Sequence, residues 1–178
     1  MKDKFSVLKE YFGHDSYRAG QEQIVDSLLS GKDVLCIMPT GAGKSVCYQV
    51  PALIFDGVTI VVSPLISLMK DQVGSLVQSG VAAAYINSSL SPNQYAKVLK
   101  NTVAGKYKII YVAPERLATP EFLDVCEKVN ISLIAVDEAH CVSQWGQDFR
   151  PSYLKITEFI SSLSRRPIVG AFTATATD

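Results

Sequence analysis

The sequence has no long apolar segment. No run approaches the roughly 18 consecutive apolar residues that a membrane-spanning helix needs. The first residues, Met1–Lys4, are charged and lead into an amphipathic stretch, which is unlike the apolar core of a secretory signal. We therefore expect a protein with no membrane partner, located in the cytoplasm.

Cysteine is scarce and an excess of charge of one sign is absent. The four cysteines, at positions 36, 47, 126 and 141, form no C-x-x-C pair, which argues against a zinc site or a disulfide framework. Cys36 and Cys47 lie in apolar surroundings and are predicted to be core residues. Seventeen basic and 17 acidic residues give a net charge of zero. Composition alone therefore does not indicate a nucleic-acid partner, and any such contact is expected to be local.

The chain does contain a regular alternation of short apolar runs and helical patterns. Strands are predicted at 33–38, 58–63, 82–86, 108–112, 133–137 and 168–172, and most of these runs are continuously apolar. Helices are predicted at 21–30, 43–53, 65–79, 92–104, 120–128 and 153–162. This order predicts one α/β domain, a doubly wound and mostly parallel sheet with helices on both faces. The last predicted strand ends close to Asp178, so we expect the natural protein to continue.

A glycine-rich turn lies between the first predicted strand and the next helix. It reads Pro39-Thr40-Gly41-Ala42-Gly43-Lys44-Ser45. The glycines let backbone N–H groups face a phosphate, and the helix start adds its partial positive charge. Lys44 is placed to reach β- and γ-phosphates, and Ser45 to bind Mg²⁺. The strict phosphate-loop pattern requires glycine where this chain has Met38. The alternative is an ordinary turn with a solvated lysine.

Another predicted strand ends in two carboxylates, Asp137 and Glu138, followed by Ala139 and His140. Doubly wound sheets bind ligands at the carboxyl ends of their strands. Asp137 suits a hold on Mg²⁺, and Glu138 suits the group that orients and deprotonates an attacking water. His140 either links hydrolysis to motion or caps a turn. Alone, the acidic pair is equally a polar helix start, but together with Lys44 it indicates a nucleotide-hydrolysing site.

Asp137–His140 is the DEAH form of a superfamily 2 helicase signature, and other motifs accompany it. They are Phe12-Gly13 with Arg18-Ala19-Gly20-Gln21, Ser63–Gln72, Tyr111–Leu117, Cys141–Tyr153 and Phe172–Thr177. Through them the chain resembles the RecQ family of DNA helicases from about residue 12 to residue 177. The resemblance implies a RecA-like P-loop domain that uses ATP and Mg²⁺. It also implies that residues 1–178 are the first lobe of a 3′-to-5′ helicase of DNA repair and recombination, whose second lobe lies elsewhere.

The resemblance assigns nucleotide recognition to His14, Arg18 and Gln21. The Gln21 amide suits the N6 and N7 atoms of adenine, and the Arg18 guanidinium suits stacking on a base. The family commonly has tyrosine at the stacking position, where the smaller ring of His14 covers less area. The alternative for Arg18 and Gln21 is an ordinary surface helix start.

The resemblance also assigns DNA binding or coupling to residues in several motifs. These are Ser63, Pro64, Gln72, Arg116, Gln144, Trp145, Asp148, Phe149, Arg150, Thr173 and Thr175. Trp145 and Phe149 lie in a polar loop that suits stacking on unpaired bases, although such a loop can also plug its own hydrophobic hole. Thr173 and Thr175 either connect hydrolysis to movement or are ordinary strand residues. RecQ proteins usually carry histidine where this chain has Gln147.

The expected partners are therefore single-stranded and duplex DNA and the second RecA-like lobe, with a nucleoid location in a bacterium. Family members place their arginine fingers on that second lobe, so we expect the isolated chain to be nearly inactive. An RNA helicase or a plain ATPase has the same fold, but the loop from Ser143 to Arg150 argues against both. A regulatory module that holds nucleotide without hydrolysing it is the alternative from another functional class.

Overall fold

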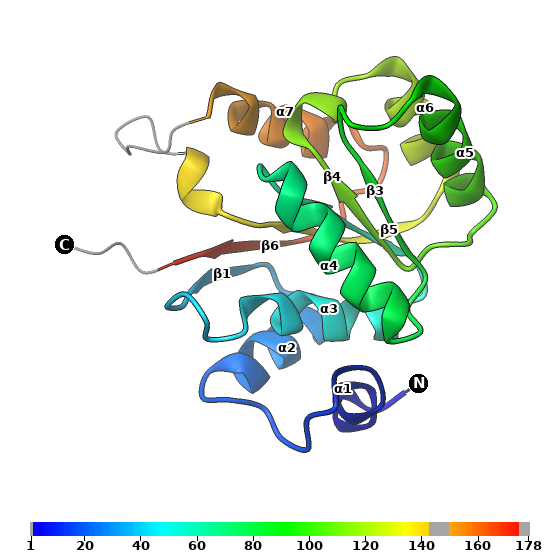
Figure 1. The fold of residues 1–178 in the computed structure, drawn as a ribbon. Helices are drawn as coiled ribbons and strands as arrows, with labels where there is room; N and C mark the ends of the chain where they lie inside the picture. The colour runs from blue at the N-terminus through cyan, green and yellow to red at the C-terminus, as the bar shows by residue number, and fades with distance from the viewer. Residues whose placement is uncertain (1, 143–149, 175–178) are drawn as a thin grey trace.

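The computed structural model describes residues 2–142 and 150–174 (Figure 1). The strands are β1 (Val34–Ile37), β2 (Val58–Val62), β3 (Ala83–Ile86), β4 (Ile109–Val112), β5 (Ile131–Val136) and β6 (Ile168–Thr173). The helices are α1 (Lys4–Phe12), α2 (Gln21–Leu29), α3 (Lys44–Ile54), α4 (Ile66–Gln78), α5 (Pro92–Val103), α6 (Pro120–Lys128) and α7 (Lys155–Ser162). Short 3₁₀ helices span Pro114–Arg116, Ala139–Val142 and Pro151–Leu154.

The strands form one six-stranded sheet in the order β1-β6-β5-β2-β4-β3. Every neighbouring pair is parallel, so the carboxyl ends of all these strands lie along one edge. Parallel neighbours require crossover connections, and the helices between consecutive strands supply them. The predicted α/β fold, with a doubly wound parallel sheet, is confirmed.

Helices cover the sheet on both faces and enclose two apolar cores (Figure 1). The first core packs α2, α3 and α4 against one face and contains Tyr48, Met69 and Phe172. The second packs α5, α6 and α7 against the other face and contains Phe122 and Phe159. All four cysteines are buried, as predicted for Cys36 and Cys47. Within the described ranges, no helix combines the length and the apolar character needed to cross a membrane.

Helix α1 has clear local signals, although the sequence patterns identified only an amphipathic stretch there. The Asp3 carboxylate accepts hydrogen bonds from Phe5 N and Ser6 N and so caps its amino end. Gly13, with φ of 71°, ends it in the left-handed conformation. Val7 and Leu8 are buried against α2 and α3. The helix therefore extends the first helical layer by packing on α2 and α3.

The structure differs from the predictions in several details. Strand β5 begins at Ile131, two residues earlier than predicted. A 3₁₀ turn, Pro151–Leu154, precedes α7, so the last helix begins two residues later than predicted. The prediction that the apolar strands are covered on both faces is wrong for β1. This strand lies at the sheet edge, and Leu35 and Ile37 are 70% and 57% exposed. A continuous apolar run does not distinguish an edge strand from a central one, because hydrophobicity carries no information on strand order.

Candidate active site

The predicted functional motifs meet along the carboxyl edge of the sheet. Backbone hydrogen bonds continue past the strand ends and hold neighbouring motifs together. Met38 N donates to Thr173 O at 3.1 Å, Asp137 N to Val62 O at 2.9 Å, and Ser63 N to Val112 O at 3.2 Å. Across the edge the order is therefore phosphate loop, Thr173, acidic pair, Ser63, and the turn that holds Arg116. Segments far apart in the sequence form one continuous surface.

The phosphate loop connects β1 to α3 through two left-handed glycines. Gly41 and Gly43 have φ of 83° and 80°, values that side-chain-bearing residues rarely adopt. Gly43 is followed directly by Lys44, the first residue of α3, so the loop ends at a helix amino terminus. Lys44 Nζ donates to Met38 O at 3.3 Å and thus lies back across the loop. Backbone N–H groups, a helix start and one lysine together suit an anionic phosphate.

A brace from the start of α2 supports this loop. Gln21 is only 4% exposed, and its Nε2 donates to Ala42 O at 3.2 Å and to Gly43 O at 3.0 Å. Gln21 Oε1 accepts from Arg18 N at 2.8 Å, and Arg18 Nη1 donates to Gly41 O at 3.0 Å. The sequence predicted contacts of both residues with the adenine base of the nucleotide, and it gave no sign of this brace. Recognition of adenine by Gln21 and Arg18, with the exposed His14 nearby in sequence, stays a prediction.

Substitution of the loop glycines tests the brace. We expect Gly41→Ala and Gly43→Ala each to lower the free energy of unfolding by roughly 1–2 kcal/mol through left-handed strain. Gly43→Ala should cost more, because its Cβ would lie 2.5 Å from Gln21 Nε2, whereas a Cβ at Gly41 meets nothing within 4 Å. Each hydrogen bond of Gln21 that is lost adds about 0.5–1.5 kcal/mol. Equal losses in urea unfolding of the two variants would show that the brace contributes nothing.

The acidic pair lies at the end of β5. Asp137 is buried, and its Oδ1 accepts a hydrogen bond from Glu138 N at 3.0 Å. Burial, and then the charge of Glu138, raise the pKa of Asp137 to about 6, while the hydrogen bond from Glu138 N and the charge of Lys44 act in the opposite direction. The protein groups alone therefore leave this carboxylate poorly neutralised. A bound cation would offset that cost, so the position suits a metal ligand.

Glu138 and His140 have unusual local geometry. Within the described ranges, Glu138 is the non-glycine residue with positive φ, at 53°. Strain of this kind costs free energy and concentrates at functional sites. His140 Nδ1 lies 3.3 Å from Glu138 Oε2 and 3.0 Å from Thr173 Oγ1. His140 thus bridges the ends of β5 and β6.

The segment after His140 begins and ends beside the acidic pair. Arg150 N donates to Cys141 O at 3.0 Å, and the buried Tyr153 hydroxyl donates to Asp137 O at 2.8 Å. The predicted residues Gln144, Trp145, Asp148 and Phe149, and also Thr175, lie outside the described residues. The two flanks of residues 143–149 are therefore fixed to the strand end that carries Asp137.

The remaining predicted DNA contacts have different surroundings. Ser63 is buried at 1% exposure, and Pro64 beside it is partly buried. The Arg116 guanidinium lies 5.2 Å from the centre of the Tyr95 ring, a cation–π distance. Gln72 Oε1 accepts from two tyrosine hydroxyls and is turned toward the core. Of these side chains, Ser63 is buried, Gln72 faces the core, and the Arg116 guanidinium lies over an aromatic ring.

Metal binding at this edge would rely on few protein ligands. Within the described ranges, no group of three His, Cys, Asp or Glu side chains gathers as a metal cluster. Mg²⁺ in nucleotide sites is commonly held by one or two protein groups together with phosphate oxygens. The predicted pair, Ser45 and Asp137, follows that pattern.

Comparison with known families identifies the chain. The family model for DEAD/DEAH box helicases matches residues 18–178. The chain belongs to the DEAD/DEAH box helicase family. The matched range includes the brace, the phosphate loop and the acidic pair of this helicase domain.

The curated relatives of this helicase domain confirm its resemblance to RecQ. It is 49% identical to the ATP-dependent DNA helicase RecQ of Bacillus subtilis over 97% of this chain and 29% of that protein. It is 48% identical to RecQ of Haemophilus influenzae over 96% of this chain and 28% of that protein. The chain thus spans less than a third of the length of these relatives.

Solved helicase structures share the fold of this domain. The DUF1998 helicase MrfA superposes with a TM-score of 0.77 at 19% identity, over 99% of this chain and 29% of that one. A hypothetical ATP-dependent RNA helicase from Sulfolobus tokodaii has a TM-score of 0.75 at 21% identity, over 100% of this chain and 52% of that one. At these identities the likeness shows the fold alone.

Proposed function

We propose that this domain is the ATP-binding motor lobe of a 3′-to-5′ DNA helicase. The observation that carries the proposal is the juxtaposition of a braced phosphate loop after β1, Thr173 after β6 and the acidic pair after β5. Identity of 49% to a RecQ DNA helicase supports DNA as the substrate. The direction of movement rests on the resemblance to that family.

In this proposal the phosphate loop holds ATP through its backbone N–H groups and Lys44. Ser45 and Asp137 would hold Mg²⁺, which would supply neutralisation of the phosphate charge. Glu138 accepts the proton of the attacking water and positions it in line with the phosphate. His140 is bonded to Thr173 and lies close to Glu138. It conveys the loss of the γ-phosphate on hydrolysis from Glu138 to the end of β6.

DNA contacts would occupy the same edge farther from the phosphate loop. We assign Arg116, Trp145 and Phe149 to contacts with the DNA strand. A second RecA-like lobe is the proposed partner that closes over the nucleotide, and hydrolysis would change the angle between the two lobes. Because Tyr153 bonds to Asp137 O and Arg150 N bonds to Cys141 O, a base that stacks in this loop can influence Glu138.

Trp145→Ala in the full-length protein tests this coupling. Stacking contributes roughly 1–3 kcal/mol per base, so the DNA concentration for half-maximal ATPase stimulation should rise about 5- to 150-fold. Basal ATPase and nucleotide affinity should stay unchanged, and unwinding should fall. Trp145→Phe keeps an aromatic face and should recover most of the stimulation.

Two results would contradict the coupling role of Trp145. A large fall in melting temperature of Trp145→Ala would show that the loop plugs a hydrophobic hole. Equal loss of basal and stimulated rates would place the loop in the hydrolytic site itself. A wild-type protein that binds nucleotide but never hydrolyses it would instead favour a regulatory module over a helicase.

A further inference from the structure

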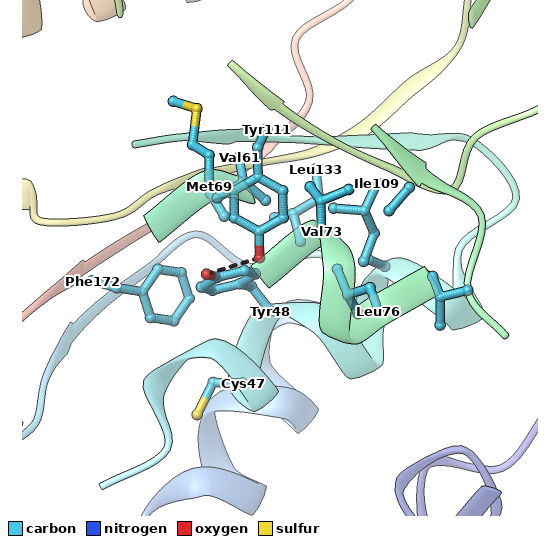
Figure 2. Packing of buried hydrophobic residues seen from close by; sticks show 14 of the residues in the cluster. Cys47, Tyr48, Val61, Met69, Val73, Leu76, Ile109, Tyr111, Leu133 and Phe172 are labelled. Carbon is cyan, nitrogen blue, oxygen red and sulfur yellow. Dashed lines mark hydrogen bonds between the residues drawn. The ribbon is translucent and has the colours of Figure 1, made fainter. Parts of the chain in front are cut away.

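A cluster of buried and partly buried polar groups lies at one side of the otherwise apolar first core. Tyr111 OH accepts from Gln49 Nε2 at 2.9 Å and donates to Gln72 Oε1. The Tyr48 hydroxyl lies 3.4 Å from Tyr111 OH and 3.3 Å from Gln72 Oε1. Figure 2 shows the two tyrosine hydroxyls facing each other across the core. Tyr48 and Tyr111 are 0% and 1% exposed, so their hydroxyls find their partners within the protein.

The cluster joins three elements, α3, α4 and β4, that each lead to residues of the proposed site. Tyr48 lies one turn after Lys44 on the phosphate-loop helix α3. Gln72 belongs to α4, which follows Ser63 and Pro64, and Tyr111 belongs to β4, which leads to the turn of Arg116.

The ring of Tyr48 extends the connection to β6. It packs edge-on against Phe172, with ring centroids 5.1 Å apart, and Phe172 directly precedes Thr173 (Figure 2). Tyr48 is therefore in contact with α4, β4 and β6 at the same time. The Tyr48 hydroxyl thus lies where the phosphate-loop helix α3 meets α4 and β4 inside the core.

The hydrogen bonds of Tyr48 have two alternative arrangements. A hydroxyl has a single proton, and that of Tyr48 has two acceptors at nearly equal distance, Gln72 Oε1 and Tyr111 OH. Burial raises the pKa of both tyrosines, to about 12 for Tyr111, so both stay protonated donors. A surface pocket of about 260 Å³ beside α3 and α4, lined in part by Gln49 and Gln72, leaves room for small shifts. A displacement of α3 against α4 can therefore exchange one hydrogen bond for the other.

We propose that Tyr48, Gln72 and Tyr111 are positioning residues that couple nucleotide binding at the phosphate loop to DNA binding at the ends of α4 and β4. The inference rests on the proposed function and adds the route through the core by which the two sites communicate. Movement of α3 on nucleotide binding changes the partner of the Tyr48 hydroxyl, and the change orients α4 and β4. These tyrosines contact neither ligand, so their effect is on coupling rather than on either affinity alone.

The test measures the coupling factor in the full-length protein. This factor is the ratio of the dissociation constants for a labelled single-stranded oligonucleotide, by fluorescence anisotropy, without and with Mg²⁺ and a non-hydrolysable ATP analogue. Typical coupling factors are about 5–150. Tyr48→Phe removes the hydroxyl and keeps the ring, so the factor should move about 2- to 12-fold toward one, the equivalent of one hydrogen bond. Affinity for the analogue without DNA should not change.

Two further variants complete the design. Tyr107 lies just before β4, at the amino ends of the strands, and its hydroxyl accepts a hydrogen bond from Asn101 Nδ2. Tyr107→Phe removes this hydroxyl and should retain the wild-type coupling factor. Gln72→Met removes the shared acceptor, so adding it to Tyr48→Phe should reduce the factor little further.

Each outcome has a definite meaning. A wild-type factor in Tyr48→Phe would overturn the inference while leaving the proposed function intact. Loss of both affinities in parallel with melting temperature would overturn it in favour of a purely structural cluster. If the wild-type protein itself has a coupling factor of one, or binds neither ligand, the proposed function is refuted and this inference with it.

Discussion

Glu138→Gln is expected to lower ATP hydrolysis by the full-length protein about 10²- to 10⁴-fold, with or without DNA, because the proton acceptor for the attacking water is lost. The amide keeps the shape of the carboxylate, so the strained backbone at φ of 53° and the neighbouring loop should persist. Nucleotide affinity should be retained, since Lys44 and the loop N–H groups are unchanged. Calorimetry with Mg-ATP and a steady-state phosphate-release assay would measure both quantities.

Two other variants define the limits of this result. Glu121→Gln makes the same chemical change at an exposed position in the first turn of α6 and should leave hydrolysis unaffected. Lys44→Ala should abolish most nucleotide binding, because it removes the mobile cation beside the β- and γ-phosphates. If Glu138→Gln hydrolyses ATP at the wild-type rate, the water-activating group is elsewhere. If it fails to bind nucleotide, Glu138 supports the binding site rather than the chemistry.

The second large expected effect is a very low rate of ATP hydrolysis by residues 1–178 alone. An arginine finger that stabilises the transition state contributes roughly 10³- to 10⁵-fold in rate. The resemblance places such arginines on a second lobe, and the chain spans about 29% of the RecQ relative from Bacillus subtilis. In the proposed function, the groups on this sheet edge bind and orient ATP, and a second lobe that closes over the nucleotide completes the site. Residues 1–178 alone should therefore bind Mg-ATP weakly and hydrolyse it barely above background.

Strand–turn–helix context was enough to predict the fold and the place of the phosphate loop. The run of apolar residues into Pro39–Ser45 predicted a parallel strand, a glycine turn and a helix start, and the structure has all three. Asp137 was predicted for the same edge because parallel strands share one direction. Both predictions use information that is local in sequence or follows from chain topology.

Contacts between distant side chains could not be predicted in this way. The Gln21 brace depends on how closely α2 approaches the loop, and a polar helix start gives no measure of that distance. His140 and Thr173 are 33 residues apart, and their bond exists because β5 and β6 are neighbours. Tyr48 resembles an ordinary core residue in sequence, since its hydroxyl partners are 24 and 63 residues away. Strand order and side-chain packing had to be known first.

The most direct test of the motor-lobe assignment is ATP turnover by the full-length protein and by residues 1–178, each with and without single-stranded DNA. Lys44→Ala in the full-length protein sets the background rate. The proposed function predicts strong stimulation of the full-length protein by DNA, and turnover by the isolated lobe at least about 10³-fold lower, the contribution of a missing arginine finger. DNA-stimulated turnover by the isolated lobe at the full-length rate, or a full-length protein that hydrolyses ATP without responding to DNA, would contradict it.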